Sequence, residues 1–79
     1  MELLQLKYFQ TVAYTEHITK ASKKLNIAQP SLSLMIKRLE DEIGTPLFDR
    51  KGRNIQLNEE GKILLKHVNT IFLKLKMQK

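Results

Sequence analysis

The residues best suited to chemistry lie at the start of one segment, IAQPSLSLMIKRLE, which spans residues 27–40. Gln29 carries both a hydrogen-bond donor and an acceptor, a combination that can pair with an adenine edge in the major groove of DNA. Ser31 and Ser33 are small, so a helix that starts here can bring its tip close to another surface, and its exposed backbone N–H groups suit phosphate. The alternative that Gln29 or Ser31 merely caps the helix stays open for either residue taken alone.

The rest of this segment predicts a helix with two different faces. At about 100° per residue, one narrow sector holds the expected core residues Leu32, Ile36, Leu39 and Ile43. The face turned away from this core carries Pro30, Leu34, Lys37 and Arg38. Leu34 is unexpected there, because it is large and apolar and points to where a partner would lie. Contact with a thymine methyl group is our hypothesis for Leu34.

A second basic cluster, Arg50, Lys51 and Arg53, surrounds Gly52 at the expected tip of a hairpin. Charged hairpin tips are common and can be merely solvated. Beside a helix that enters a groove, however, such a tip is expected to contact phosphates or to place arginine in the minor groove, where the negative potential favours it. Phosphate contacts could also come from the lysines of the preceding short helix, Lys20, Lys23 and Lys24, of which at most two can face the backbone at once.

The elements that must position these residues can be read from the spacing of apolar side chains and from helix-end signals. Pro30 suits the first turn of a helix, and Gly44 with Pro46 ends that helix. Asn58 is a good N-cap, and the acidic residues after it favour the positive end of a helix dipole. The expected order is helices over residues 2–13, 18–25 and 30–43, a two-stranded ribbon of PLFDR and NIQL, and a last helix from Asn58 to the end of the chain.

The last helix carries more apolar surface than so small a body can bury. Leu64, Val68, Ile71 and Leu75 follow a four-three-four spacing, which is typical of a coiled-coil seam, and Phe72 lies beside it. Packing of all these side chains on the first helix is one interpretation. We favour the other, in which Leu64, Val68, Ile71, Phe72 and Leu75 pair two copies of the chain. Gly61 costs about 1 kcal/mol inside a helix, so we expect a close backbone contact near it.

Composition narrows the classes of protein. The chain of 79 residues is long enough for one small domain, and its net charge of +6 favours a polyanionic partner. It has no cysteine, which excludes disulfides and thiolate zinc sites. The N-terminus does not read as a signal peptide, and no apolar run approaches the roughly 20 residues that span a bilayer. His17 and His67 belong to no nucleophile or metal-ligand pattern, so we expect no catalytic residue, metal or cofactor.

Together these residues are recognisable. The segment AQPSLSLMIKRLEDEIGTPLFDRKGRNIQLNEEGKILL closely resembles the N-terminal DNA-binding domain of LysR-type bacterial transcriptional regulators, and LKYFQTVA and ITKASKKLNI resemble its first two helices. The match covers essentially the whole chain without a gap. The matching positions are Gln29, Pro30, Ser33, Ile36, Leu39, Glu40, Gly44, Leu47, Phe48, Arg50, Arg53, Leu57 and Gly61.

The resemblance implies a mainly α fold. A winged helix-turn-helix of three helices and a two-stranded wing, residues 1–57, would be followed by a long linker helix, residues 58–79, that pairs two subunits. It also implies a cytoplasmic bacterial regulator, not an enzyme, whose homodimer binds an interrupted inverted repeat in double-stranded DNA. A small-molecule effector is expected only for a further domain absent from this sequence. The implied DNA contacts are Gln29, Pro30, Ser31 and Ser33 at the major groove, Thr19 near a phosphate, and Arg50 and Arg53 in the wing.

Several positions depart from the family pattern. Ala28 and His17 stand where serine is usual, and Ser22 replaces an alanine. Leu34 and Met35 stand where arginine and glutamine are frequent, so no base preference carries over to them. Three alternatives remain: a winged-helix module that docks proteins, a domain like that of molybdate regulators, and binding to a membrane surface. The basic wing and recognition face speak against the docking module.

Overall fold

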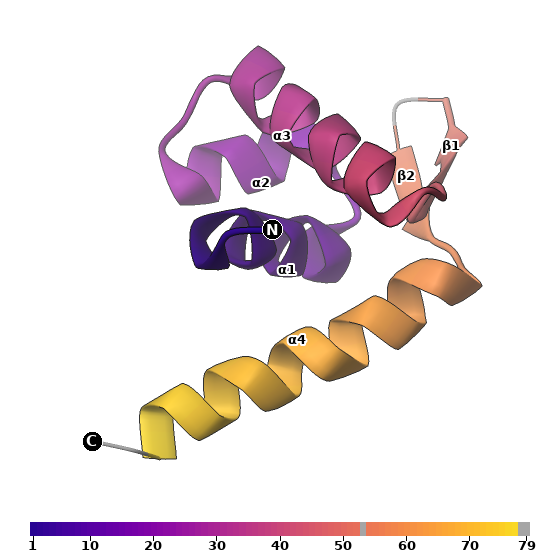
Figure 1. The fold of residues 1–79 in the computed structure, drawn as a ribbon. Coiled ribbons are helices and arrows are strands. Elements are labelled where there is room, and N and C mark those ends of the chain that lie inside the picture. Colours follow the sequence, from indigo (N-terminus) through magenta and orange to yellow (C-terminus); the bar gives the residue numbers. More distant parts are fainter. Residues whose placement is uncertain (53, 78–79) are drawn as a thin grey trace.

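The computed structural model describes residues 1–52 and 54–77. Within these residues the chain forms three helices, a two-stranded antiparallel ribbon and a long last helix, which confirms the predicted fold class (Figure 1). The elements in chain order are α1 (Leu3–Thr15), α2 (Ile18–Leu25), α3 (Gln29–Ile43), β1 (Phe48–Lys51), β2 (Asn54–Leu57) and α4 (Glu59–Met77).

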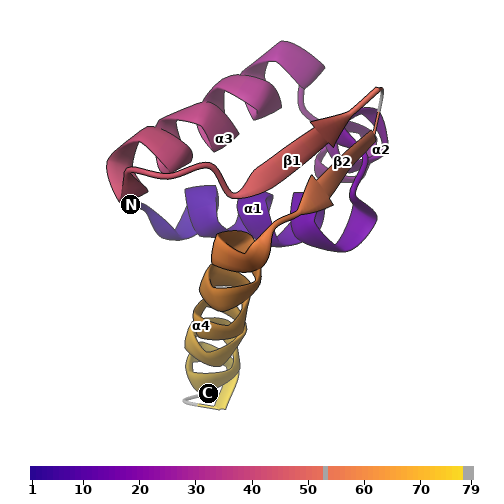
Figure 2. The same ribbon diagram turned by 90° about the vertical axis from the view of Figure 1, so that its right-hand side faces the viewer.

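The three N-terminal helices and the ribbon form one body, and α4 extends from it. Helix α1 lies between α4 on one side and α2 with α3 on the other (Figure 1). Seen from the ribbon side, α4 projects away from this body (Figure 2). None of the helices in the described ranges is long and apolar enough to cross a membrane.

The core lies where the four helices and the ribbon meet. Leu32, Ile36 and Leu39 are buried as the helical spacing predicted, whereas Ile43 is only partly buried. Phe9 of α1 stacks against Phe48 of β1, with ring centroids 5.6 Å apart and a tilt of 55°. Tilted aromatic contacts of this kind stabilise a core beyond the area that they bury, and this one fixes the ribbon against α1.

The ends of α1 and α3 differ slightly from the prediction. Helix α1 continues to Thr15, two residues further than expected, and ends at Glu16, which adopts a left-handed conformation with φ 50°. The Glu16 carboxylate accepts a hydrogen bond of 2.8 Å from the backbone N–H of Leu57, so the end of α1 is tied to β2. At α3, Ala28 occupies the N-cap position, and Gln29 and Ser31 are part of the helix.

The ribbon forms the predicted wing, with one strand shifted. β2 matches the predicted NIQL, but β1 begins at Phe48 and not at Pro46. Pro46 has no N–H to give to a strand, and the N–H of Leu47 donates to the carboxylate of Glu40 at 2.7 Å. Neither residue therefore has an N–H available for pairing with β2, although the Leu47 carbonyl accepts from the N–H of Asn58 at 3.0 Å.

The start of α4 is fixed against the ribbon. Asn58 caps the helix as predicted: its Oδ1 accepts from the N–H of Gly61 at 2.8 Å, and its Nδ2 donates to the Pro46 carbonyl at 2.9 Å. A Cβ at Gly61 would collide with the backbone oxygen of Leu47 and the side chain of Leu57. The close contact expected near Gly61 is thus confirmed, and it sets the angle at which α4 leaves the wing.

One residue predicted for the dimer seam is placed elsewhere. Val68 is completely buried in the core of the single chain, so it is not on a surface that a second copy could reach, and its assignment to the dimer interface is wrong. Leu64 and Phe72 are partly buried against the same core, and the Lys7 ammonium lies 5.9 Å from the centre of the Phe72 ring. One helical row of α4 therefore packs on its own body, as the alternative interpretation had it.

Candidate nucleic-acid interface

Helices α2 and α3 form the helix-turn-helix unit, and the turn between them is held by backbone bonds. Asn26 adopts a left-handed conformation with φ 58°, and its N–H donates to the carbonyls of Lys23 and Ser22 at the end of α2. The next N–H, that of Ile27, also donates to the Ser22 carbonyl, at 3.1 Å. Asparagine tolerates this conformation better than most residues, which explains why the chain turns here and directs α3 away from α2.

An open hollow lies between the start of α2, one side of α3 and the wing. Its lining combines hydroxyl, amide, imidazole and guanidinium groups with the backbone of the wing tip. The polar residues that line it are His17, Thr19, Gln29, Ser33 and Arg50. Three of the predicted contact elements, namely the second helix, the third helix and the wing, therefore meet at one concave surface.

Two predicted site residues contact each other inside this hollow. The hydroxyl of Thr19 donates to the side-chain oxygen of Gln29 over 3.1 Å. Thr19 also supplies the carbonyl that accepts from the Ser22 hydroxyl at 2.8 Å, so the first turn of α2 is internally braced. Gln29 is exposed, and its amide nitrogen can donate to an acceptor outside the protein.

His17 also lines this hollow, although the sequence did not lead us to assign it to the site. It is the N-cap of α2, where its Nδ1 accepts a hydrogen bond of 3.2 Å from the backbone N–H of Lys20. In a neutral ring with this bond the proton lies on Nε2, which can then act as a donor. The only hint in the sequence was the position of His17, directly before a short helix and in place of the usual serine.

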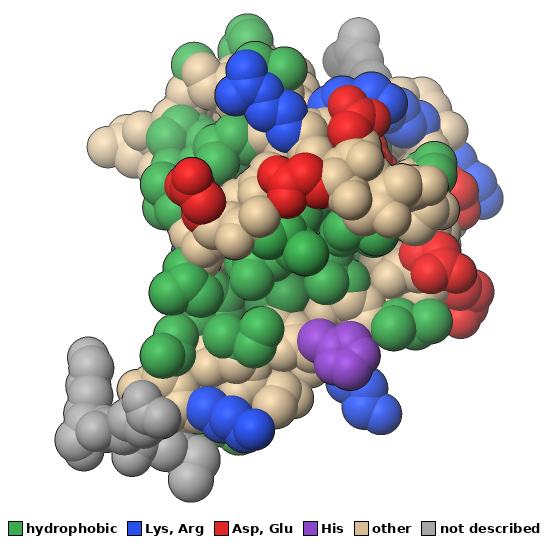
Figure 3. Space-filling model, in the orientation of Figure 1, with side chains coloured by type: hydrophobic (Ala, Val, Ile, Leu, Met, Phe, Trp, Pro, Cys, Tyr) green, Lys and Arg blue, Asp and Glu red, His purple; other side chains and the backbone are tan. Residues whose placement is uncertain are grey.

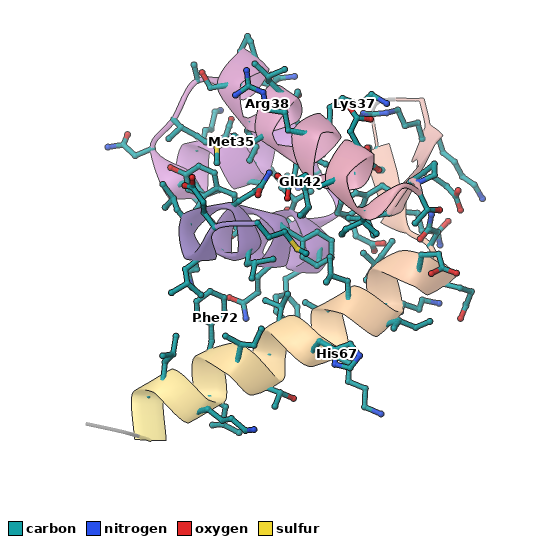
Figure 4. All side chains as sticks on the ribbon, viewed as in Figure 1. Met35, Lys37, Arg38, Glu42, His67 and Phe72 are labelled. Carbon is teal, nitrogen blue, oxygen red and sulfur yellow. The ribbon has the colours of Figure 1, made fainter. Side chains whose placement is uncertain are left out.

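The basic side chains lie around this hollow and on the outer side of α3. Lys37 and Arg38 project from α3 away from α1 (Figure 4), and Lys and Arg side chains lie near the top of the molecule beside hydrophobic ones (Figure 3). Lys37 pairs with Asp41 at 3.3 Å, but both side chains are about two-thirds exposed, so this ion pair contributes little. Arg50 and Lys51 are exposed on β1, and Lys20 is exposed on α2. Arg53 lies outside the described residues.

The remaining predicted contacts are placed on the outer side of α3. Pro30, Ser31 and Leu34 are exposed, and Ser33 is partly buried at the border with the hollow.

The predicted dimer residues are spread over two faces of α4. Ile71 and Leu75 are exposed, whereas Leu64, Val68 and Phe72 face the body. His67 lies on α4 far from α3 (Figure 4). Among the described residues, no group of three His, Cys, Asp or Glu side chains could hold a metal ion.

Comparison with protein families gives a match over most of the chain. Residues 3–62 match the model for bacterial regulatory helix-turn-helix proteins of the lysR family. The uncharacterized HTH-type transcriptional regulator YybE of Bacillus subtilis (strain 168) is 55% identical over 71 residues, which are 90% of this chain and 24% of that protein. HTH-type transcriptional regulator BudR of Klebsiella aerogenes is 56% identical over 61 residues, 77% of this chain and 43% of that protein.

A solved structure shows the same fold in contact with DNA. The DNA-binding domain of BenM in complex with catB site 1 DNA superposes with a TM-score of 0.92 and 36% identity, covering 99% of this chain and 87% of that one. The curated relatives are much longer: the chain spans between 21% and 43% of the length of the most similar ones.

Proposed function

Because this chain belongs to the LysR family of bacterial regulatory helix-turn-helix proteins, we propose that it binds double-stranded DNA sequence-specifically as part of a transcriptional regulator. The observation that carries the proposal is the hollow in which Thr19, Gln29 and Arg50 come together from three elements. A DNA duplex offers both partners that this surface needs, since phosphates suit its basic rim and base edges suit its amide and hydroxyl groups.

Helix α3 enters the major groove in this proposal. The groove is about 12 Å wide and admits one helix. At the N-terminal end of α3 the exposed side chains are Gln29, Pro30 and Ser31, none of which is large and apolar. Gln29 reads a base edge, while Pro30, Ser31 and Ser33 allow close approach of the helix tip. Lys37 and Arg38 lie about one turn after Ser33 and reach phosphates on either side of the groove.

The wing and α2 hold the duplex in register. Arg50 and Lys51 extend from β1 beside the hollow, where they contact the backbone or the minor groove, and Arg53 belongs to the same basic tip by sequence. Thr19 and Lys20 lie in the first turn of α2 and approach a phosphate from the other side. Phosphate contacts of this kind position the protein but carry no base preference.

Two copies of the chain pair through α4, with residues 1–57 as the DNA-binding unit and 58–79 as the start of the linker helix. The exposed apolar residues that support this are Ile63, Ile71, Leu73 and Leu75. With two-fold symmetry the pair matches an interrupted inverted repeat. A small-molecule effector would bind a further domain of the kind that the greater length of the relatives allows. A regulator that binds bacterial DNA would act in the cytoplasm.

Selection from a library of random-sequence duplexes tests DNA recognition. We expect the chain to enrich one motif whose two halves are related by an inverted repeat. Enrichment of no motif, together with binding that is equally weak for all duplexes, would favour the protein-docking alternative.

The dimer has its own test. Ile71→Lys together with Leu75→Lys should shift the sedimentation of the chain towards the monomer, while the Thr70→Lys control on α4, itself exposed, should not. A wild-type chain that is monomeric throughout the concentration range would contradict pairing through this helix alone.

A further inference from the structure

Leu34 is an apolar side chain on the polar side of α3. It is 50% exposed, although Leu32 and Ile36, two positions away on either side, are 0% and 1% exposed. The helix therefore turns Leu34 outward by its regular geometry, and no loop or helix end accounts for the exposure.

Single exposed leucines are ordinary on protein surfaces, so the surroundings of Leu34 matter more than its exposure. One turn before it lies Pro30, and one turn after it lies Arg38, both exposed. Ser33 beside it lines the hollow that Arg50 also lines. Leu34 is thus placed at the centre of the proposed DNA-contacting side of α3.

Leu34 does not belong to an apolar docking patch. Among the described residues, the other large hydrophobic side chains that are exposed come from the N-terminal Met1, from α1 and from α4. A protein-docking surface needs several neighbouring apolar groups, whereas the outer side of α3 adds to Leu34 only the small apolar Pro30, together with Lys37 and Arg38 (Figure 4). Lys37 pairs with Asp41 on this side, but Arg38 and Arg50 leave it basic, which favours a polyanion, and we expect an apolar part of that polyanion to cover Leu34.

DNA offers one apolar group at the base edges of the major groove, the C5 methyl of thymine. We propose that Leu34 is a specificity-determining residue that contacts a thymine methyl group and favours thymine at one position of each half-site. This inference rests on the proposed function and adds to it the identity of one base. The contact removes both apolar groups from water, whereas cytosine at the same position lacks the methyl group and offers Leu34 only the C5–H.

Replacement of single thymines by deoxyuridine tests the contact, because uracil lacks only the methyl group. The probe is the duplex that the 79-residue chain enriches from a random-sequence library, with each thymine replaced in turn. For the wild-type chain, one position per half-site should show a loss of affinity of about fourfold, the effect of burying one methylene-sized group. Leu34→Ala should bind the unmodified duplex several times more weakly and should no longer distinguish thymine from uracil at that position.

The matched control is Leu4→Ala, which removes an equally exposed leucine (55%) from α1 and should leave the thymine preference unchanged. If Leu34→Ala keeps the full wild-type preference for thymine over uracil, or if no thymine shows such a preference, the inference is wrong although DNA binding stands. If the wild-type chain enriches no duplex, the proposed function itself fails. The two failures are therefore distinguishable.

Discussion

The hydroxyl of Thr19 donates a 3.1 Å hydrogen bond to the side-chain oxygen of Gln29, so the first turn of α2 holds the first side chain of α3. Gln29 is otherwise an exposed residue with several rotatable bonds. Holding one end of its amide limits the directions in which the other end can donate, and pre-organised side chains lose less entropy on binding. If Gln29 reads a base, as proposed, Thr19 would act on that reading through Gln29.

Thr19→Val removes this bond and keeps the shape of the side chain. We expect a loss of about 1 kcal/mol, or about fivefold in Kd, for the preferred duplex and a smaller loss for unrelated duplexes. Thr19→Ser retains the hydroxyl and should preserve the preference. Competition titrations with both duplexes measure the effect, and equal losses on both would show that Thr19 contacts only phosphate.

Gln29→Ala and Arg50→Ala should weaken DNA binding in different ways. Gln29→Ala removes the proposed base contact, so discrimination between preferred and unrelated duplexes should fall by about 1–3 kcal/mol. If Arg50 contacts a phosphate, Arg50→Ala should lower the affinity for all duplexes and decrease the magnitude of the salt slope by about 1. Anisotropy titrations at several salt concentrations separate the two effects. A uniform loss for Gln29→Ala would speak against base reading.

Glu40→Ala should destabilise the chain and detach the start of the wing. The carboxylate accepts the N–H of Leu47 at 2.7 Å in a buried setting, and a buried N–H left without a partner costs about 1–3 kcal/mol. Glu40→Gln keeps an acceptor oxygen and should recover part of this loss. The control is Glu42→Ala, which breaks only an exposed pair with the N-terminal ammonium. Urea unfolding gives the free energies, and similar values for Glu40→Ala and Glu42→Ala would contradict this role.

Gly61→Ala should be destabilising, although alanine normally favours a helix by about 1 kcal/mol over glycine. The new Cβ would meet the Leu47 backbone oxygen and the Leu57 side chain, and overpacking of this kind costs about 1–3 kcal/mol. Lys62→Ala, at the exposed next position, is the control. Thermal unfolding measures both variants, and a more stable Gly61→Ala would show that α4 can move away from the wing.

Much of the fold could be predicted because helix periodicity and end signals are local properties of the sequence. Helix α2 and strand β2 have the predicted bounds. The helical periodicity that predicts Leu32 and Ile36 as buried also predicts the outward position of Leu34. The start of β1 could not be predicted in this way. It depends on a bond between Glu40 and Leu47 that forms only when α3 and the wing come together.

The dimer seam shows the same limit. Spacing alone places Val68 with Ile71 and Leu75 in one apolar pattern, but it does not say which part of the pattern faces the protein's own body. The structure buries Val68 in its own core and leaves Ile71 and Leu75 exposed. The bond between Thr19 and Gln29 likewise joins two helices across a turn, so the sequence placed both residues at the site without predicting their contact.

On the proposed function, the surface formed by α2, α3 and the wing binds the phosphates and base edges of DNA. The most direct measurement is the affinity of the chain for its selected duplex as a function of salt concentration. Five described basic residues surround this surface, namely Lys20, Lys37, Arg38, Arg50 and Lys51. We predict that log Kobs falls linearly with log salt, with a slope of about −4 or steeper, as expected for about four or more phosphate contacts. A slope near zero would contradict the account.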